Sequence, residues 1–279
     1  MNGSYMKTLI QQLVLALSLF VLSVQATNTV KAHQSSVQVT TFKAALELAN
    51  AGNAAEVYNV AYYYQTGYGV QKNEQEARKW FKRAEQTQSG SVHYKLGRLI
   101  ETGLFFEANI KKALAHYQYA AKAGDPYGMN NFGSHLISGQ FIMQNDTEGV
   151  MWLEKSANLG MTEAMLNLAE YYREQKQLTN TILWLTKAAK ANNIDGMVKL
   201  AKIYLTEKDY HNALLWFKAA ANKDNDEAQL YMAMMTDKGL GIERSAIDAR
   251  SWLEKSAQGG NQKAKRILAK NSEKKQAQN

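Results

Sequence analysis

Residues 53–88 read NAAEVYNVAYYYQTGYGVQKNEQEARKWFKRAEQTQ, and residues 225–260 return to the same pattern as NDEAQLYMAMMTDKGLGIERSAIDARSWLEKSAQGG. Both segments place an apolar residue beside alanine, then a glycine-rich turn, and then a tryptophan. Comparing the chain with itself extends this pattern to six contiguous repeats. They cover residues 53–88, 89–124, 125–160, 161–192, 193–224 and 225–260. Repeats of this length are typical of solenoids, in which each unit packs against its neighbours.

Each repeat is predicted to form two antiparallel helices, which we call helix A and helix B. Helix A begins at a polar residue that can accept hydrogen bonds from the free amides of the first turn. These residues are Asn53, Ser89, Asp125, Asn193, Asn225 and, in a truncated seventh copy, Asn261. The single proline, Pro126, follows Asp125 and so falls in the first turn of a helix, where its missing N–H costs nothing.

The tryptophans all occupy one equivalent position of helix B. They are Trp80, Trp152, Trp184, Trp216 and Trp252, and His116 takes the same position in the second repeat. An aromatic residue that recurs from repeat to repeat is explained more simply by packing between helices than by ligand binding. We therefore expect the tryptophans to form the structural core of the repeats and His116 to be a packed histidine.

The first repeat resembles the SEL-1-like repeat, a relative of the tetratricopeptide repeat found in exported bacterial proteins among others. The residues that carry the resemblance are Val60-Ala61, Tyr64, Gly67-x-Gly69-Val70, Ala77, Trp80-Phe81 and Arg83-Ala84. Repeats two and three depart from it with Phe105 and Phe141 at the second loop glycine, and repeats four and five lack four residues there. The resemblance implies an all-α fold, an α/α solenoid with terminal capping helices, and a non-enzymatic role in binding other proteins.

By analogy with tetratricopeptide grooves, the resemblance also implies that the A helices line a concave surface for a protein or peptide partner. The candidate partner-binding residues are Tyr62, Gln65, Arg98, Glu101, Ser134, Ile137, Glu170, Arg173, Lys202, Leu205, Met234 and Asp237. Both charges, apolar groups and an aromatic ring are present in this set, which suits a polypeptide with both charges and an apolar anchor. The alternative is that these residues form ordinary solvated helix faces.

The two ends of the chain differ from the repeats. Residues 1–26 carry Lys7, an apolar stretch and a small-residue pattern ending at Ala26, which predicts a secretory signal peptide cleaved after Ala26. The alternative is an uncleaved anchor. Residues 27–40 are predicted to be a flexible lead-in, residues 41–52 an N-terminal capping helix, and residues 261–279 a C-terminal capping helix with a basic tail. We expect an exported protein, periplasmic or secreted, with no stable membrane insertion after cleavage.

The formal net charge of +8 is concentrated near the C-terminus. Residues 27–260 contain 26 lysines and arginines against 24 aspartates and glutamates. This nearly neutral body argues against a nucleic-acid partner. The basic tail suits weak contact with an anionic surface, although a solenoid cap also needs a polar outer face for solubility.

The sequence offers little for catalysis. There is no cysteine, which excludes disulfides and thiol chemistry. The histidines are interpreted as isolated residues, without an HExxH pair, and Ser272-x-x-Lys275 as a chance match to a penicillin-recognising pattern. We expect no enzyme, no cofactor and no metal. The predicted function is a protein-interaction scaffold in the bacterial cell envelope; the alternatives are an immunity-type neutraliser of a toxin, or a weak hydrolase acting on the cell wall or β-lactams.

Overall fold

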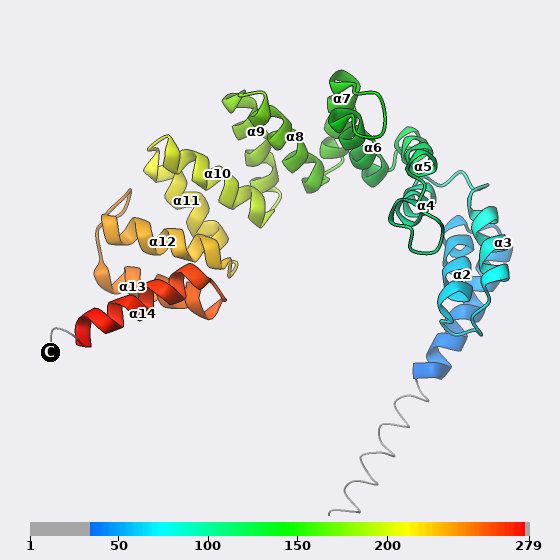
Figure 1. Ribbon diagram of the computed structural model, residues 1–279, viewed down its shortest axis with the longest axis horizontal. Coiled ribbons are helices and arrows are strands. Elements are labelled where there is room, and N and C mark those ends of the chain that lie inside the picture. The colour runs from blue at the N-terminus through cyan, green and yellow to red at the C-terminus, as the bar shows by residue number, and fades with distance from the viewer. Residues whose placement is uncertain (1–33, 277–279) are drawn as a thin grey trace, which may run out of the picture. The chain divides into compact units, whose positions relative to one another are not determined.

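The structure, a computed structural model, describes residues 34–276, and all regular elements within this range are helices (Figure 1). A helix over 34–50 comes first. It is followed by α2 (Ala54–Thr66), α3 (Glu74–Ala84), α4 (Gly90–Thr102), α5 (Ile110–Lys122), α6 (Pro126–Ser138), α7 (Asp146–Asn158), α8 (Thr162–Glu174), α9 (Leu178–Lys190), α10 (Ile194–Thr206), α11 (Tyr210–Ala221), α12 (Asp226–Lys238), α13 (Ala246–Gln258) and α14 (Gln262–Gln276). The predicted signal peptide and its cleavage site lie outside the described residues.

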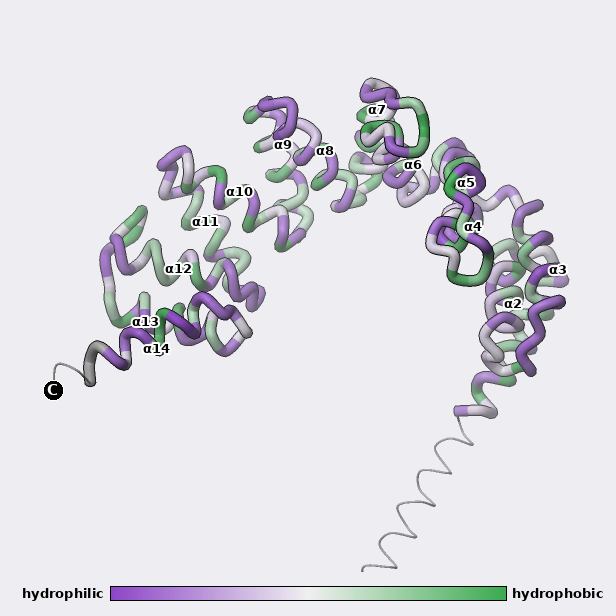
Figure 2. The backbone as a smooth tube through the Cα atoms, in the orientation of Figure 1, coloured by the Kyte–Doolittle hydropathy of each residue, from purple (hydrophilic) through white to green (hydrophobic). Residues whose placement is uncertain are grey.

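The helices pack in sequential pairs, which confirms the predicted α/α solenoid class. The even-numbered helices α2 to α12 are the A helices, and the odd-numbered helices α3 to α13 are the B helices. The most extensive helix–helix contacts join helix A to helix B of the same repeat, and further contacts join α7 to α8, α9 to α10, α11 to α12 and α13 to α14. Apolar and polar residues are interspersed along the helices (Figure 2). The chain divides into an N-terminal unit that ends at Gly128 and a C-terminal unit that begins at Met129, and each is described separately.

The predicted caps of the A helices are confirmed. The side chains of Asn53, Ser89, Asp125, Asn193, Asn225 and Asn261 each accept a hydrogen bond from an amide in the first turn. Pro126 is the first residue of α6, as expected. A second set of caps that the sequence analysis did not identify begins the B helices, namely Asn73, Asn109, Asn145, Asp209 and Ser245. Both helices of most repeats are thus capped by side chains.

The loop between helix A and helix B explains the two repeat lengths. In the first repeat, α2 ends at Gly67 in the left-handed conformation, with φ of 81°. The shorter fourth and fifth repeats turn instead through Lys176 and Lys208, with φ of 57° and 61°. Residues other than glycine rarely adopt these angles. A short turn therefore replaces the glycine loop at a cost in backbone strain.

The tryptophans lie at the edge of the core, a refinement of the predicted packing. Trp152 and Trp184 are buried, whereas Trp80, Trp216 and Trp252 are half-buried against the core clusters. The next residue in each B helix is buried in every repeat: Phe81, Tyr117, Leu153, Leu185, Phe217 and Leu253. A cation one turn later covers four of the indole rings, as Lys187 does with Nζ 3.8 Å from the Trp184 ring centroid.

The prediction of a flexible lead-in through residue 40 is wrong for residues 34–40, which are helical and continuous with the expected capping helix. Phe42 and Ala49 of that helix are buried, as a cap requires. The extra turns are supported by the glycine loop of the first repeat. A Cβ atom on Gly69 would overlap the backbone oxygen of Gln38, so the two backbones are in close contact.

At the other end, the cap is confirmed and the tail is part of it. Ala264 is buried, and Ile267 and Leu268 pack against the same cluster. The basic segment is helical within the described range, because α14 continues to Gln276 through residues of high helix propensity. No helix within residues 34–276 is both long enough and apolar enough to cross a bilayer.

Candidate functional site

Side chains on neighbouring A helices contact each other in the C-terminal unit. Asn167 on α8 donates from Nδ2 to Asn130 Oδ1 at 2.8 Å and to Ser134 Oγ at 3.3 Å, both on α6. Lys202 on α10 donates to Glu227 Oε1 on α12 at 2.6 Å. The surface formed by the side chains that neighbouring A helices present to each other and to solvent is called the A-helix face. Of the predicted candidates, Ser134 and Lys202 therefore lie on the A-helix face and connect one repeat to the next.

The charges on this part of the A-helix face are paired. Nε of Arg173 donates to Glu170 Oε2 at 2.9 Å, and the guanidinium lowers the pKa of the Glu170 carboxyl. Lys199 lies 2.8 Å from Asp195 Oδ2 on the same helix. Such exposed pairs add little stability but leave a surface of low net charge.

The remaining candidates of the C-terminal unit divide between core and surface. Ile137 and Leu205 are half-buried and pack against the hydrophobic core, and their assignment to the binding surface stays a prediction. Met234 and Asp237 line an open groove of about 740 Å³ with residues of α13 and α14. That groove lies between α12, α13 and the C-terminal capping helix α14.

The N-terminal unit has a different A-helix face, built from tyrosines and two cations. Lys95 Nζ on α4 lies 5.1 Å from the ring centroid of Tyr58 on α2. Nη1 of Arg98 donates to the Tyr94 hydroxyl at 3.3 Å. Tyr94 also stacks on Tyr127, in the first turn of α6, with 5.2 Å between ring centroids. We call Tyr58, Tyr94, Lys95, Arg98 and Tyr127 the tyrosine–cation face.

The other predicted residues of this unit lie around the tyrosine–cation face. Tyr62 is exposed and contacts Phe105 edge to face at 5.7 Å, whereas Gln65 is half-buried. Glu101 is held by the Tyr117 hydroxyl, which donates to Oε2 at 2.5 Å. Arg98 was predicted from the sequence, whereas Tyr58, Tyr94, Lys95 and Tyr127 were not. Their signal in the sequence was a tyrosine or lysine at three other positions of helix A, of which only that of Tyr127 is fully exposed.

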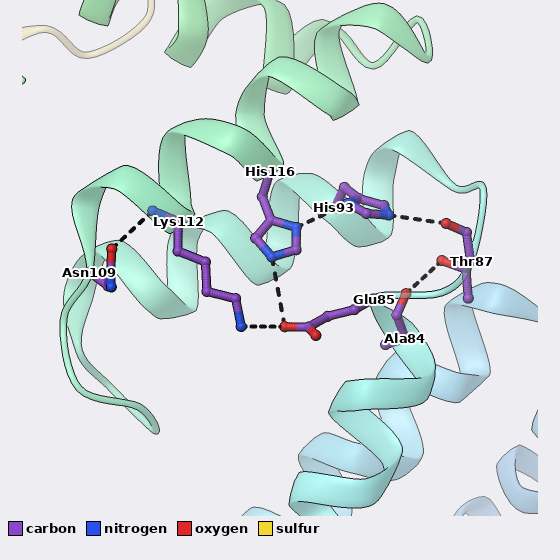
Figure 3. Close-up of polar contacts among 7 residues, drawn as sticks. All are labelled: Ala84, Glu85, Thr87, His93, Asn109, Lys112 and His116. Atoms are coloured by element: carbon purple, nitrogen blue, oxygen red, sulfur yellow. Dashed lines mark hydrogen bonds and ion pairs between the residues drawn. The ribbon is translucent and has the colours of Figure 1, made fainter. Parts of the chain in front are cut away.

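A buried histidine pair lies on the other side of α4, where the first two repeats meet (Figure 3). Nδ1 of His93 lies 3.0 Å from Nδ1 of His116 on α5, and Nε2 of His93 lies 3.0 Å from the Thr87 carbonyl oxygen. Nε2 of His116 lies 3.8 Å from Glu85 Oε1, which also accepts from Lys112 at 2.6 Å. The interpretation of the histidines as isolated residues is therefore wrong for this pair, although His116 is packed as expected.

The hydrogen-bond partners of the histidine pair determine which ring nitrogens carry a hydrogen. The Thr87 carbonyl can only accept, so Nε2 of His93 carries a hydrogen and its Nδ1 accepts from His116 Nδ1–H. The remaining nitrogen of His116 then faces Glu85 with a lone pair. Burial lowers the pKa of His93, and burial together with the neighbouring His93 lowers that of His116 to about 4. The pair is therefore neutral at neutral pH and acts as part of the junction between repeats.

The described residues provide no support for a catalytic or metal centre. They contain no group of three histidine, aspartate or glutamate side chains placed to hold a metal ion. Ser272 donates to the Leu268 carbonyl of its own helix at 3.0 Å, so its proton is engaged by the backbone.

The B helices present a second surface, formed by exposed apolar side chains. Met151, Leu183 and Leu215 each precede the tryptophan of their helix, and all three are exposed. Their recurrence on α7, α9 and α11 gives the outer face an apolar character at one repeat position.

Comparison with known families agrees with the helix pairs. A model of the Sel1 repeat matches residues 57–86, 91–125, 126–161, 162–193, 194–225 and 226–261. The chain is a Sel1 repeat protein. Its six matched repeats begin and end within a few residues of the predicted ones. No match was found among curated proteins.

Solved structures show the same fold at low sequence identity. A protective antigen of uropathogenic Escherichia coli with an SLR fold is 23% identical, with a TM-score of 0.67, over 85% of this Sel1 repeat protein and 53% of the antigen. A Sel1 repeat protein from Oxalobacter formigenes is 22% identical, with a TM-score of 0.61, over 78% and 99% of the two chains. PilF of Pseudomonas aeruginosa is 16% identical, with a TM-score of 0.51, over 78% and 99%. The chain spans about half the length of the antigen.

Proposed function

We propose that this Sel1 repeat protein is a non-enzymatic scaffold that binds a polypeptide partner on its A-helix face. The observation that carries the proposal is the composition of that face. In the N-terminal unit, aromatic rings and cations of neighbouring A helices contact each other. In the C-terminal unit, amide and charged side chains of neighbouring A helices do so. Such mixed surfaces suit recognition of a peptide backbone and its side chains together.

The proposed location is the bacterial cell envelope. Its support is the sequence of residues 1–26, which has the features of a secretory signal. Cell fractionation followed by N-terminal sequencing tests this. We expect an exported chain that begins at Thr27; a chain that stays in the cytoplasm with residues 1–26 attached contradicts the location and leaves the binding proposal to its own test.

Charge reversal tests the binding surface. We expect Arg98→Glu and Arg173→Glu together to reduce capture of the cellular partner by the tagged protein, because both guanidinium groups are exposed on A helices. Leu183→Gln on α9 is the matched control, since this exposed residue belongs to a B helix. Far-UV circular dichroism checks that all variants keep their helicity. Capture that is lost only with the control variant would place the partner on the B helices.

The enzymatic alternative has a direct test. The purified protein is incubated with a chromogenic β-lactam and, separately, with peptidoglycan. We expect no turnover above that of heat-denatured protein. Turnover that is abolished by Ser272→Ala would overturn the non-enzymatic proposal.

A further inference from the structure

We propose that the tyrosine–cation face of the N-terminal unit binds an acidic segment of the partner polypeptide. This inference rests on the proposed scaffold function and adds the chemistry of the bound segment. It is carried by Lys95 and Arg98, two neighbouring cations on α4 that are exposed or half-exposed beside tyrosine rings.

Lys95 and Arg98 differ from three cations on the A helices of the C-terminal unit, which are paired with carboxylates. Arg173, Lys199 and Lys202 in the C-terminal unit each form an ion pair. Among the ion pairs of the described residues, none includes Lys95 or Arg98. The positive charge of this face is therefore available to a ligand.

Tyrosines orient both cations. The Tyr94 hydroxyl accepts one hydrogen of Arg98, and a guanidinium has five, so an edge with parallel donors remains for a carboxylate. Lys95 lies over the ring of Tyr58, and burial, with Tyr62 nearby, raises the pKa of the Tyr58 hydroxyl to about 12. The phenol thus stays neutral and contributes an aromatic surface, not a competing anion.

Tyr127 of this face and the neighbouring Tyr62 offer contacts for apolar side chains. Tyr62 is 39% exposed and Tyr127 is 50% exposed, on either side of α4. Tyrosine presents a large ring at low cost in side-chain entropy. A segment that alternates acidic residues with an apolar or aromatic residue would use both the cations and the rings.

The arrangement favours a short acidic peptide over a nucleic acid. The tyrosine–cation face contains only two cations, and Glu101 lies one turn beyond Arg98 on α4. The hydrogen bond with Tyr94 is the main cause that raises the pKa of the Arg98 guanidinium, and the charge of Glu101 adds to it. A carboxylate there repels a continuous row of phosphates. It also limits the acidic part of a peptide to the region of Lys95 and Arg98.

Fluorescence anisotropy tests the inference with a labelled peptide in which glutamate alternates with alanine around a central phenylalanine. The full chain should bind this peptide more tightly than the same peptide with lysine in place of glutamate, and binding should weaken as salt is added. Lys95→Gln combined with Arg98→Gln should reduce the affinity by about tenfold. The matched control, Lys79→Gln with Arg250→Gln, removes two paired cations from the B helices α3 and α13 and should leave the affinity unchanged.

Three results would overturn the inference. The first is that the double variant binds the acidic peptide as tightly as the wild-type chain does. The other two are that the wild-type chain binds the lysine peptide, or a labelled single-stranded oligonucleotide, more tightly than the acidic peptide. The scaffold proposal fails separately. If crosslinkers on the A helices capture a cellular polypeptide while the acidic peptide does not bind, the A-helix face is the binding site and the acidic chemistry is wrong.

Discussion

His93 and His116 share a hydrogen bond of 3.0 Å between their Nδ1 atoms, in the interior of the second repeat. A further proton can be added to the pair without breaking this bond only at Nε2 of His116, which faces Glu85 and lies near Lys112. Burial opposes that charge, and Glu85 only partly offsets it. The junction between the first two repeats is therefore sensitive to acid.

We predict that the free energy of unfolding falls as the pH is lowered from 6.5 towards 4. The unfolded chain binds a proton at His116 with its ordinary pKa of 6.5, whereas the folded chain does so only near 4. Protonation therefore stabilises the unfolded state relative to the folded state, which lowers the free energy of unfolding by about 2–3 kcal/mol near pH 4. The pKa of His93 is lowered too, which acts in the same direction. Urea unfolding at a series of pH values measures this.

Variants identify the group responsible. His116→Trp introduces the residue that the other repeats have, and His116→Gln can still donate to His93. Both should flatten the loss of stability between pH 6.5 and 4. His211→Gln, at an exposed position of α11, should leave it unchanged. Equal pH dependence in the wild type and both His116 variants would show that the pair is not the cause.

The contact between the first loop and the N-terminal helix predicts a large effect of Gly69→Ala. Gly69 and Gly52 both have positive φ, of 69° and 94°, so alanine is strained at either position. Only at Gly69 would the new methyl group also overlap the backbone of Gln38. We expect Gly69→Ala to be more destabilising than Gly52→Ala by at least about 1 kcal/mol. Thermal unfolding of the two variants tests this, and equal losses would mean that helix 34–50 does not pack on the loop.

The turn of the fourth repeat predicts a stabilising substitution. Lys176 adopts φ of 57°, which costs a residue with a side chain about 1–2 kcal/mol. Lys176→Gly removes that strain and should raise stability by about 0.5 kcal/mol after the greater entropy of glycine in the unfolded chain is counted. Lys187→Gly, within α9, should instead lower stability by about 1 kcal/mol. Destabilisation by both substitutions would contradict the assigned turn.

The burial of the tryptophans predicts a graded series. Trp184→Ala should cost about 3–5 kcal/mol, because this indole is buried in the core of the C-terminal unit. Trp80→Ala should cost less, since the Trp80 side chain is only half-buried. Denaturant unfolding followed by circular dichroism compares the two. A larger loss for Trp80→Ala would reverse the assigned order of burial.

The fold was predictable because its determinants are local and repeated. A cap such as Asn53, a turn glycine such as Gly67 and the tryptophan register act within one repeat, and six copies reinforce the pattern. Pro126 could be placed at the start of a helix for the same reason.

The features that escaped prediction depend on packing between elements. His93 and His116 are 23 positions apart, and their contact requires α4 and α5 to pair at one particular register. The helical residues 34–40 lie against the loop around Gly69, a contact between segments distant in sequence. The tyrosine–cation face arises because Tyr58, Lys95 and Tyr127 come from three helices, so no single repeat contains its pattern.

The central claim, that the A-helix face binds a polypeptide partner, is tested most directly by site-specific photo-crosslinking in living cells. A benzophenone amino acid is placed singly at Tyr62, Tyr127 or Glu170 on the A helices, and at Met151, Leu183 or Leu215 on the B helices; all six positions are exposed. Our account predicts that one and the same polypeptide is crosslinked from the A-helix positions and is absent from the B-helix positions. Crosslinking of a polypeptide from the B-helix positions alone, or of none from any A-helix position, would contradict it.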